Sequence, residues 1–331
     1  MGRSVARDDD SLLLVADVGG TNTRVAMARG CTILPDSIRR YTNRDHANLA
    51  PVLRRYREEQ GGATPLGACV AVAGPVSDGR AELTNLDWSI DTKRLVQATG
   101  ARDGAILNDL QAQGHALGYL DQSAVRTIIQ APPTSPARDI GARLVIGVGT
   151  GFNAAPVHQL SSGRFVPPCE AGHANLPVRT EAELRLCNFV STAHGFPAVE
   201  DVLSGRGLEQ VYRWLSSEAG ADEEYLAAEI MARVDSDPRA EAAVIQFVRI
   251  LGTVAGNLSL IHLPLGGVFL VGGVARAMGS YLLHSCFAEA FRDKGRFAGF
   301  MANFPVSLIE DDFAALVGCA AHLRERQGLD D

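Results

Sequence analysis

The stretch Leu12–Met27, LLLVADVGGTNTRVAM, constrains the fold of this chain more than any other. Two apolar runs flank a glycine-rich segment, a pattern that predicts a β-hairpin with a tight turn. Successive N–H groups in such a turn form an anion-binding concavity, to which Thr21, Asn22 and Thr23 add side-chain donors. Asp17 ends the first strand, where its carboxylate could hold a hydrated Mg²⁺ against phosphates. The alternative interpretation is an ordinary hairpin with an Asx turn.

Length and charge narrow the class of protein. The chain has 331 residues, 46% of them hydrophobic and 21% charged, which is a globular composition. This length favours two lobes over one simple core. The net charge of -7 argues against a nucleic-acid-binding protein. A negative protein that binds nucleotide phosphates needs Mg²⁺ and backbone amides in place of a basic surface.

Cysteine usage and apolar runs indicate a soluble, cytoplasmic protein without a membrane partner. The six cysteines are scattered and form no CxxC pair, which suits a reducing compartment better than a disulfide framework or a zinc site. The N-terminal MGRSVARDDDS has no apolar signal core. The most apolar stretch, Val254–Ala275, is interrupted by Pro264 and glycines, so it predicts buried helix, turn and strand.

Strand and helix patterns alternate along the chain, which predicts the α/β class. Strands are expected over residues 12–16, 24–27, 66–73, 81–88, 104–107, 144–146, 154–160, 268–271 and 306–309. Helices are expected over residues 45–60, 91–100, 110–120, 181–191, 199–218 (with a break at Ser204-Gly205), 222–234, 239–262, 278–293 and 314–327. Residues 123–140 are rich in turn signals and predict a connection between lobes.

The first hairpin pattern occurs a second time. Leu144-Val145-Ile146 runs into GVGTGFN, with Gly149, Thr150 and Gly151 at its centre, and a further strand follows. The second copy has Gly147 where the first has Asp17. Two such hairpins facing each other could bind a polyphosphate from both sides. Only the first hairpin would supply a carboxylate, Asp17, to a bound metal ion.

Asn108 and Asp109 follow a buried strand, where open α/β sheets place functional residues. An Asp in this position could take a proton from a substrate hydroxyl while the Asn amide fixes a neighbouring hydroxyl. The alternative is that the Asp caps the following helix.

Three further segments are weaker candidates. Glu170 and His173 lie in a Pro- and Gly-rich loop, which disfavours a metal site on a helix. Side by side on a loop, the two side chains could bind adjacent sugar hydroxyls. The alternative is that both are merely solvated. Glu200 has no chemical signature of its own. Gly272 and Gly273 follow a strand and permit close approach of a flat ligand such as a purine, or close packing.

No GxGxxG follows a strand, and neither GxxxxGK[ST] nor GxSxG occurs, which disfavours dinucleotide, P-loop and serine-hydrolase functions.

Taken together, these motifs resemble the bacterial glucokinase family, within the sugar kinase, actin and heat-shock ATPase fold. Six motifs occur in the family's order: DVGGTN from Asp17, LND from Leu107, GTG from Gly149, Glu170-x-x-His173, LSG from Leu203 and GGV from Gly272. The resemblance spans Leu12 to Arg326. It implies two α/β lobes closing over a cleft, residues 11–118 with a closing helix 313–331 in the small lobe and residues 119–312 in the large lobe.

The resemblance also implies the site. ATP and Mg²⁺ would bind between the two glycine-rich hairpins, and the 6-hydroxyl of glucose would lose its proton to Asp109. The hexose-binding residues would be Asn108, Asp109, Glu170, His173 and Glu200. The nucleotide-binding residues would be Asp17, Gly19, Gly20, Thr21, Asn22, Gly149, Thr150, Gly151, Gly272 and Gly273, with Asp17 holding the metal through water. A homodimer is an assembly that the resemblance allows.

Three positions depart from the usual family pattern. Asn153 stands where many members have a further Gly, and Cys169 and Ala171 make the Glu/His loop bulkier. These departures concern sugar preference more than reaction type, so a kinase of another hexose or amino sugar, such as mannose or N-acetylglucosamine, is the nearest alternative. A non-catalytic sugar sensor is an alternative from another class, and an ATPase that moves a protein partner is a third.

Overall fold

The computed structural model describes residues 11–83, 86–133, 141–161, 163–192 and 195–326. The described chain divides into two compact units. Unit 1 holds the described residues of 1–122, 159–168 and 311–331, and unit 2 holds those of 123–158 and 169–310. Part of the connection expected over 123–140, residues 84–85 of the strand expected over 81–88, the end of the closing segment at 327–331 and most of the N-terminal MGRSVARDDDS lie outside the described residues.

Unit 1 is built on a mixed sheet whose main path runs β3-β2-β1-β5-β9, with β4 also paired to β2. Its strands are β1 Leu12–Val18, β2 Asn22–Arg29, β3 Thr32–Ile33, β4 Arg39–Thr42, β5 Gly67–Val72 and β9 Asp103–Asn108. β1 and β2 are antiparallel, which confirms the predicted hairpin, and β1, β5 and β9 are parallel. Parallel strands buried on both faces explain why β1 and β5 are almost wholly apolar.

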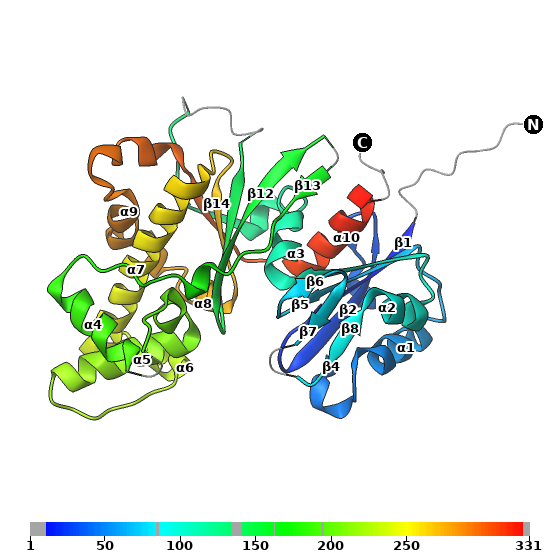
Figure 1. The fold of residues 1–331 in the computed structure, drawn as a ribbon, viewed down its shortest axis with the longest axis horizontal. Helices are drawn as coiled ribbons and strands as arrows, with labels where there is room; N and C mark the ends of the chain where they lie inside the picture. The colour runs from blue at the N-terminus through cyan, green and yellow to red at the C-terminus, as the bar shows by residue number, and fades with distance from the viewer. Residues whose placement is uncertain (1–10, 84–85, 134–140, 162, 193–194, 327–331) are drawn as a thin grey trace, which may run out of the picture. The chain divides into compact units, whose positions relative to one another are not determined.

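Helices cover both faces of this sheet (Figure 1). One face packs on α1 Leu49–Glu59 and α2 Thr92–Thr99, and the other packs on α10 Ala314–Arg326 and on α3 Asp109–Ala116. α10 comes from the end of the chain, and its Gly318 allows close packing on α3. A Cβ at Gly318 would lie 1.6 Å from the carbonyl oxygen of Ala112.

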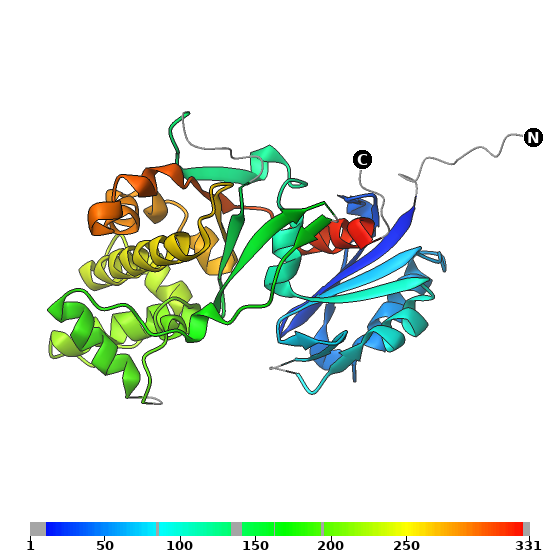
Figure 2. The same cartoon turned by 45° about the horizontal axis from the view of Figure 1, so that its top comes forward.

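Unit 2 is built on the sheet order β10-β15-β14-β11-β12-β13, although residues of β13 cluster with unit 1. Its strands are β10 Val125–Ile129, β11 Arg143–Val148, β12 Phe152–Leu160, β13 Gly163–Phe165, β14 Val268–Val271 and β15 Val306–Ile309. Its helices are α4 Glu181–Ser191, α5 Gly205–Glu218, α6 Ala227–Arg233, α7 Pro238–His262, α8 Gly273–Ala277 and α9 Ser285–Arg292. α4 to α7 and α9 gather on one side of the sheet (Figures 1 and 2).

Among the described helices, α7 alone is long and apolar enough to span a membrane. It packs between α5 and α9 in unit 2 and contributes Phe247, Leu251 and Ala255 to the core. Most of its apolar window is buried in this way, as in the core helix of a globular protein.

Six expectations from the sequence were wrong in extent or type. The helix expected over 45–60 begins at Leu49, and the helix expected over 222–234 begins at Ala227. Residues 278–293 do not form one helix. The chain turns at Gly279 and becomes extended at His284, so the segment holds a 3₁₀ turn at Tyr281–Leu283 and then α9. Residues 81–88 do not form one strand. Instead β7 Arg80–Glu82 pairs with both β6 Val76–Ser77 and β8 Ser89–Asp91. The helix expected over 110–120 ends at Ala116, ahead of Gly118 with φ +94°. The predicted connection over 123–140 contains strand β10.

Candidate functional site

The glycine-rich turn of unit 1 is closed by its own backbone. The N–H of Gly19 donates to the carbonyl oxygen of Asn22 at 3.0 Å. Gly20 and Thr21 are exposed at the tip. Asn43, only 1% exposed, holds the turn from outside, because its side-chain amide donates to the Gly19 carbonyl at 2.7 Å. The turn therefore has a fixed shape and an accessible main chain, as an anion-binding turn requires.

Asp17 lies beside this turn at the end of β1. It stands opposite Arg24 in the hairpin register, and their Oδ2 and Nη1 atoms are 3.9 Å apart. The side chain is 24% exposed. Burial raises the pKa of Asp17, and the positive charge of Arg24 offsets only part of that rise. The charge of Arg24 therefore compensates the negative charge of ionised Asp17 only in part. A carboxylate oxygen whose charge is not fully compensated is a suitable partner for Mg²⁺.

Asn108 and Asp109 lie at the same edge of the sheet as Asp17. Val18 of β1 pairs with Val72 of β5, and Val72 pairs with Asn108 of β9. Two strand spacings, about 10 Å, therefore separate the ends of β1 and β9.

Asn108 is the N-cap of α3, and Asp109, for which capping was the alternative interpretation, contacts the same backbone N–H. The Oδ1 atom of Asn108 accepts a 3.0 Å hydrogen bond from the N–H of Leu110, and its backbone N–H donates to Gln111 Oε1 at 3.1 Å. The Nδ2 of Asn108 donates to the carbonyl of Gly74 at 3.0 Å. Asp109 is the first helical residue and is half-buried. The Oδ1 atom of Asp109 accepts from the same N–H of Leu110 at 2.8 Å, which fixes its carboxylate at the start of α3.

The second glycine-rich turn, in unit 2, is closed by a 2.9 Å hydrogen bond from the N–H of Gly149 to the carbonyl of Gly151. Thr150 is exposed at its tip, and a Cβ at Gly149 would meet nothing within 4 Å. Gly272, at φ +103°, lies against this turn, because its Cβ would be 2.4 Å from the carbonyl oxygen of Val148. Gly273 opens α8 with free space around its Cβ position. The close backbone approach that the sequence predicted at Gly272 is thus to β11.

Glu200 joins this turn to the sugar-site candidates. Its Oε2 atom accepts a 2.8 Å hydrogen bond from the N–H of Phe152. A Cβ at Gly151 would lie 2.4 Å from the same oxygen, so only glycine leaves room for the carboxylate. Ser204, the N-cap of α5, donates its hydroxyl to the Glu200 carbonyl at 2.8 Å and fixes the local backbone.

The Glu170/His173 loop is tied to the same strand. Asn153 of β12 donates to the carbonyl of Cys169 at 2.5 Å, and its Oδ1 accepts from the N–H of Ala171 at 2.9 Å. His173 ends a short 3₁₀ turn, and both Glu170 and His173 are exposed. His173 and Glu200 line one cavity of about 340 Å³. Its other lining residues are Phe196, Ala198, Asp201, Ser204, Arg206, Gly207 and Gln210.

Each unit therefore gathers its own share of the predicted site. Unit 1 brings Asp17 and the Gly19 turn to the sheet edge that carries Asn108 and Asp109. Unit 2 gathers Glu170, His173, Glu200, Gly149, Thr150, Gly151, Gly272 and Gly273 around the start of β12. Sequence reasoning missed the supporting roles of Asn43 and Asn153. Asn43 lies 24 positions from Gly19 and carries no motif, whereas Asn153 was visible only as a departure from the family pattern.

Two α/β units, each with a glycine-rich hairpin turn beside polar strand ends, define a sugar kinase of the actin-like ATPase fold. The family model described as Glucokinase matches residues 14–326. A glucokinase of Mesorhizobium japonicum is 32% identical over 327 residues, covering 97% of this chain and 95% of the relative. The chain therefore belongs to the glucokinase family, the ATP-dependent kinases of glucose.

Solved structures agree with this assignment. The crystal structure of a glucokinase from an Antarctic psychrotroph superposes with a TM-score of 0.83 at 31% identity, covering 95% of this chain and 99% of that one. A ROK family glucokinase from Streptomyces griseus, in complex with glucose and AMPPNP, superposes with a TM-score of 0.63 at 20% identity, covering 96% and 100%. The second likeness concerns the fold alone.

Proposed function

We propose that this chain transfers the γ-phosphate of ATP to the 6-hydroxyl of glucose, with Asp109 as the base that accepts the hydroxyl proton. The observation that carries the proposal is the position of Asp109, directly after β9 at the sheet edge that also carries Asp17. Asp109 is the first residue of α3, and its Oδ1 atom accepts a 2.8 Å hydrogen bond from the N–H of Leu110, which fixes the carboxylate at the N-terminus of the helix. A base of this kind is worth about 10²–10⁴ in rate.

Positioning and charge stabilisation supply most of the remaining catalysis in phosphoryl transfer. We propose that the backbone N–H groups of both glycine-rich turns bind the phosphates of ATP, and that Gly272 and Gly273 border the adenosine. Asp17 would hold Mg²⁺ through water. When bound, Mg²⁺ neutralises charge on the transferred phosphoryl group.

For the sugar, we propose that Asn108, Glu170, His173 and Glu200 bind hydroxyls together with Asp109. The shared cavity of His173 and Glu200 supports this assignment, as does the bond that fixes Glu200 to the N–H of Phe152. Cys169 and Ala171 are bulkier than glycine, and we infer that they affect which hexose is preferred.

The test is an ADP-release assay with ATP and Mg²⁺ against glucose, mannose, fructose and N-acetylglucosamine, with a blank lacking sugar. Turnover with glucose is expected. Asp109→Asn should lower kcat by about 10²–10⁴ while glucose affinity, measured by calorimetry, stays nearly constant. Asp235→Asn, at an exposed position of unit 2, is the matched control and should leave kcat unchanged.

Other outcomes lead to different conclusions. Turnover with another sugar alone would keep the reaction and reassign the substrate. If the protein binds ATP but releases no ADP with any of the sugars, the kinase proposal would be overturned and the sugar-sensor alternative favoured. An unchanged kcat in Asp109→Asn would remove Asp109 from the mechanism.

A further inference from the structure

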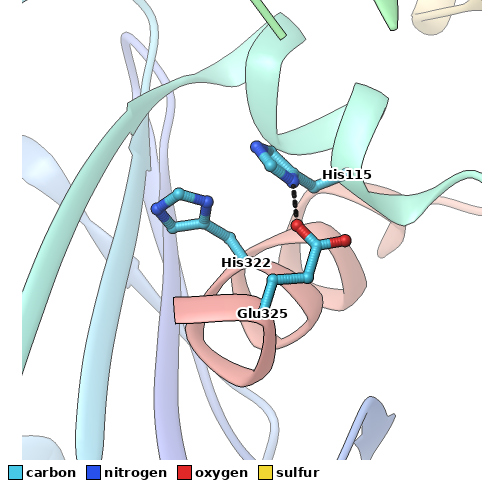
Figure 3. A group of neighbouring side chains, drawn as sticks. All are labelled: His115, His322 and Glu325. Carbon is cyan, nitrogen blue, oxygen red and sulfur yellow. Dashed lines mark hydrogen bonds and ion pairs between the residues drawn. The ribbon is translucent and has the colours of Figure 1, made fainter. Parts of the chain in front are cut away.

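Two histidines and a glutamate converge in unit 1 (Figure 3). His115 comes from α3, and His322 and Glu325 come from consecutive turns of α10. One donor atom from each side chain lies within 4.8 Å of the other two. The Nδ1 of His115 and the Oε2 of Glu325 are already 3.0 Å apart.

The cluster is largely closed to solvent. The side chains of His115 and Glu325 are 5% and 6% exposed. The ring of His322 stands edge-on to that of His115, with centroids 4.5 Å apart, and no hydrogen bond joins it to the described part of the chain. A half-buried imidazole without a hydrogen-bond partner is unusual, because burying a polar group without a partner costs stability.

His322 has donor atoms to offer to a metal ion. Histidine binds metals through the nitrogen lone pair of a neutral ring. Within the described residues no hydrogen bond occupies the ring nitrogens of His322, and one of them lies within 4.8 Å of donor atoms of His115 and Glu325.

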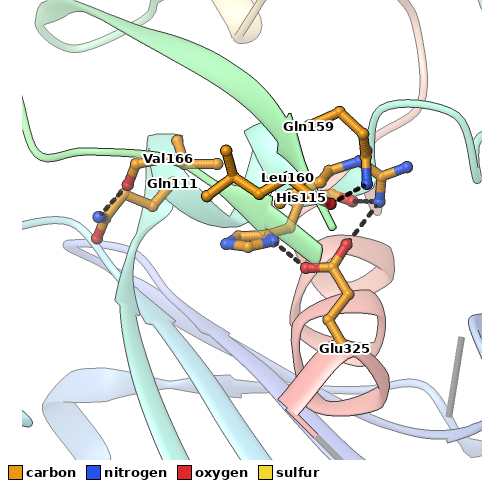
Figure 4. A network of polar contacts seen from close by, with 7 residues as sticks. Gln111, His115, Gln159, Leu160, Val166 and Glu325 are labelled. Carbon is orange, nitrogen blue, oxygen red and sulfur yellow. Dashed lines mark hydrogen bonds and ion pairs between the residues drawn. The ribbon is translucent and has the colours of Figure 1, made fainter. Parts of the chain in front are cut away.

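Arg164 fixes the glutamate from the other side. Its Nη1 atom donates to Glu325 Oε1 at 3.0 Å and to the backbone carbonyl of His115 at 3.2 Å. Figure 4 shows the bond between His115 and Glu325 within this network. Only Oε2 therefore faces the histidines, and an outer partner that orients a ligating carboxylate is typical of metal sites. The positive charge of Arg164 should make binding weaker than at a closed four-ligand zinc site.

We propose that His115, His322 and Glu325 bind a first-row transition metal ion, with Zn²⁺ as the best match. Two imidazoles and a carboxylate form a known zinc ligand set, and a water would complete the tetrahedron. Ligand atoms around such an ion lie about 3.3 Å apart at bond lengths near 2 Å, so small side-chain rotations suffice. Imidazole ligands disfavour Mg²⁺ and Ca²⁺, which prefer oxygen.

Metal binding replaces one hydrogen bond with three bonds from side chains to the ion. The hydrogen bond between His115 Nδ1 and Glu325 Oε2 is lost. The His115 ring changes tautomer: the Nδ1 proton leaves to water, Nε2 takes one up from water, and the Nδ1 lone pair binds the ion. The ion would then link α3 to α10. Since α3 begins at Asp109, this site would stabilise the helix that carries the proposed base.

The experiment uses the full chain, treated with EDTA and dialysed, then titrated with ZnCl₂ or MgCl₂. One Zn²⁺ per chain by equilibrium dialysis, with a rise in Tm that MgCl₂ does not reproduce, is expected. His322→Asn should weaken Zn²⁺ binding at least tenfold and abolish the Tm rise. It should remain folded because the His322 ring makes no hydrogen bond to the described chain. His284→Asn, at an exposed histidine of unit 2, is the matched control and should bind Zn²⁺ as the parent does.

A spectroscopic readout separates this site from the free thiols. The Co²⁺-loaded protein should show tetrahedral d–d bands without a sulfur-to-cobalt charge-transfer band. Equal Zn²⁺ binding by His322→Asn, a thiolate band, or no Zn²⁺-dependent change in Tm would overturn the proposal. None of these readouts depends on kinase activity.

Discussion

The side-chain amide of Asn43 donates a 2.7 Å hydrogen bond to the carbonyl oxygen of Gly19. The same side chain accepts a 2.8 Å hydrogen bond from the buried hydroxyl of Thr23, and its backbone N–H donates to the carbonyl of Thr21 at 2.9 Å. One buried residue thus fixes the first glycine-rich turn at three points. The shape of this turn depends on Asn43 as well as on its own glycines.

Asn43→Ala should therefore lower both stability and nucleotide affinity. It leaves the Thr23 hydroxyl and the Gly19 carbonyl without their partner, at a cost of about 1–3 kcal/mol in the free energy of unfolding. The KM for ATP should rise more than the KM for glucose. Urea denaturation and steady-state kinetics measure the two effects, with Asn188→Ala, at an exposed position, as control. A stability loss with unchanged KM for ATP would separate Asn43 from the nucleotide site.

The contact between α10 and α3 leads to a second prediction. Because a Cβ at Gly318 would lie 1.6 Å from the Ala112 carbonyl oxygen, Gly318→Ala forces the two helices apart. Overpacking of this kind costs about 1–3 kcal/mol or more. Gly299→Ala, where a Cβ meets nothing within 4 Å, should stay within about 0.5 kcal/mol of the parent. Equal urea midpoints for the two variants would contradict the close packing.

Gly151 and Glu200 supply a third prediction. A Cβ at Gly151 would displace the Glu200 carboxylate, whose end can move without disturbing the backbone. Gly151→Ala should therefore raise the KM for glucose about tenfold, the equivalent of one hydrogen bond, and change the free energy of unfolding little. Gly149→Ala, with open space at its Cβ, is the comparison and should leave the KM for glucose unchanged. If both variants change KM for glucose alike, the effect belongs to the turn and not to Glu200.

Much of the architecture could be predicted because local patterns and packing agree. α4 matches its predicted bounds, and both glycine-rich hairpins form as expected. The pattern failed over 278–293, where apolar periodicity continues through a turn at Gly279. Helix periodicity reports which face is buried, and it carries no information on whether the backbone continues.

The site was predictable only where residues follow one another along the chain. DVGGTN and Asn108-Asp109 each lie in one segment, so their patterns are visible. The bond from Asn43 to Gly19 and the cluster of His115 with His322 and Glu325 depend on tertiary packing, which brings together residues 24 and about 210 positions apart. No spacing rule links residues separated in this way, so neither could be read from sequence.

Asp17 supplies the last prediction, which concerns pH. Burial raises its pKa in the folded protein, so the folded state binds the proton more tightly than the unfolded chain does. Stability due to this group is therefore greatest at low pH and falls as pH rises from about 4 through the raised pKa. Each unit of that rise is worth about 1.4 kcal/mol against the ionised folded state.

Asp17→Asn removes this cost, so the ligand-free variant should be more stable than the parent at pH 8 and nearly equal to it at pH 4. Its kcat should nevertheless fall, because the carboxylate proposed to hold Mg²⁺ is gone. Urea denaturation at both pH values and the ADP-release assay measure the two effects, with Asp36→Asn, at an exposed position of unit 1, as control. A variant less stable than the parent at pH 8 would mean that the attraction of Arg24, 3.9 Å away, outweighs burial. A more stable variant with full activity would show that Asp17 has no part in binding the metal.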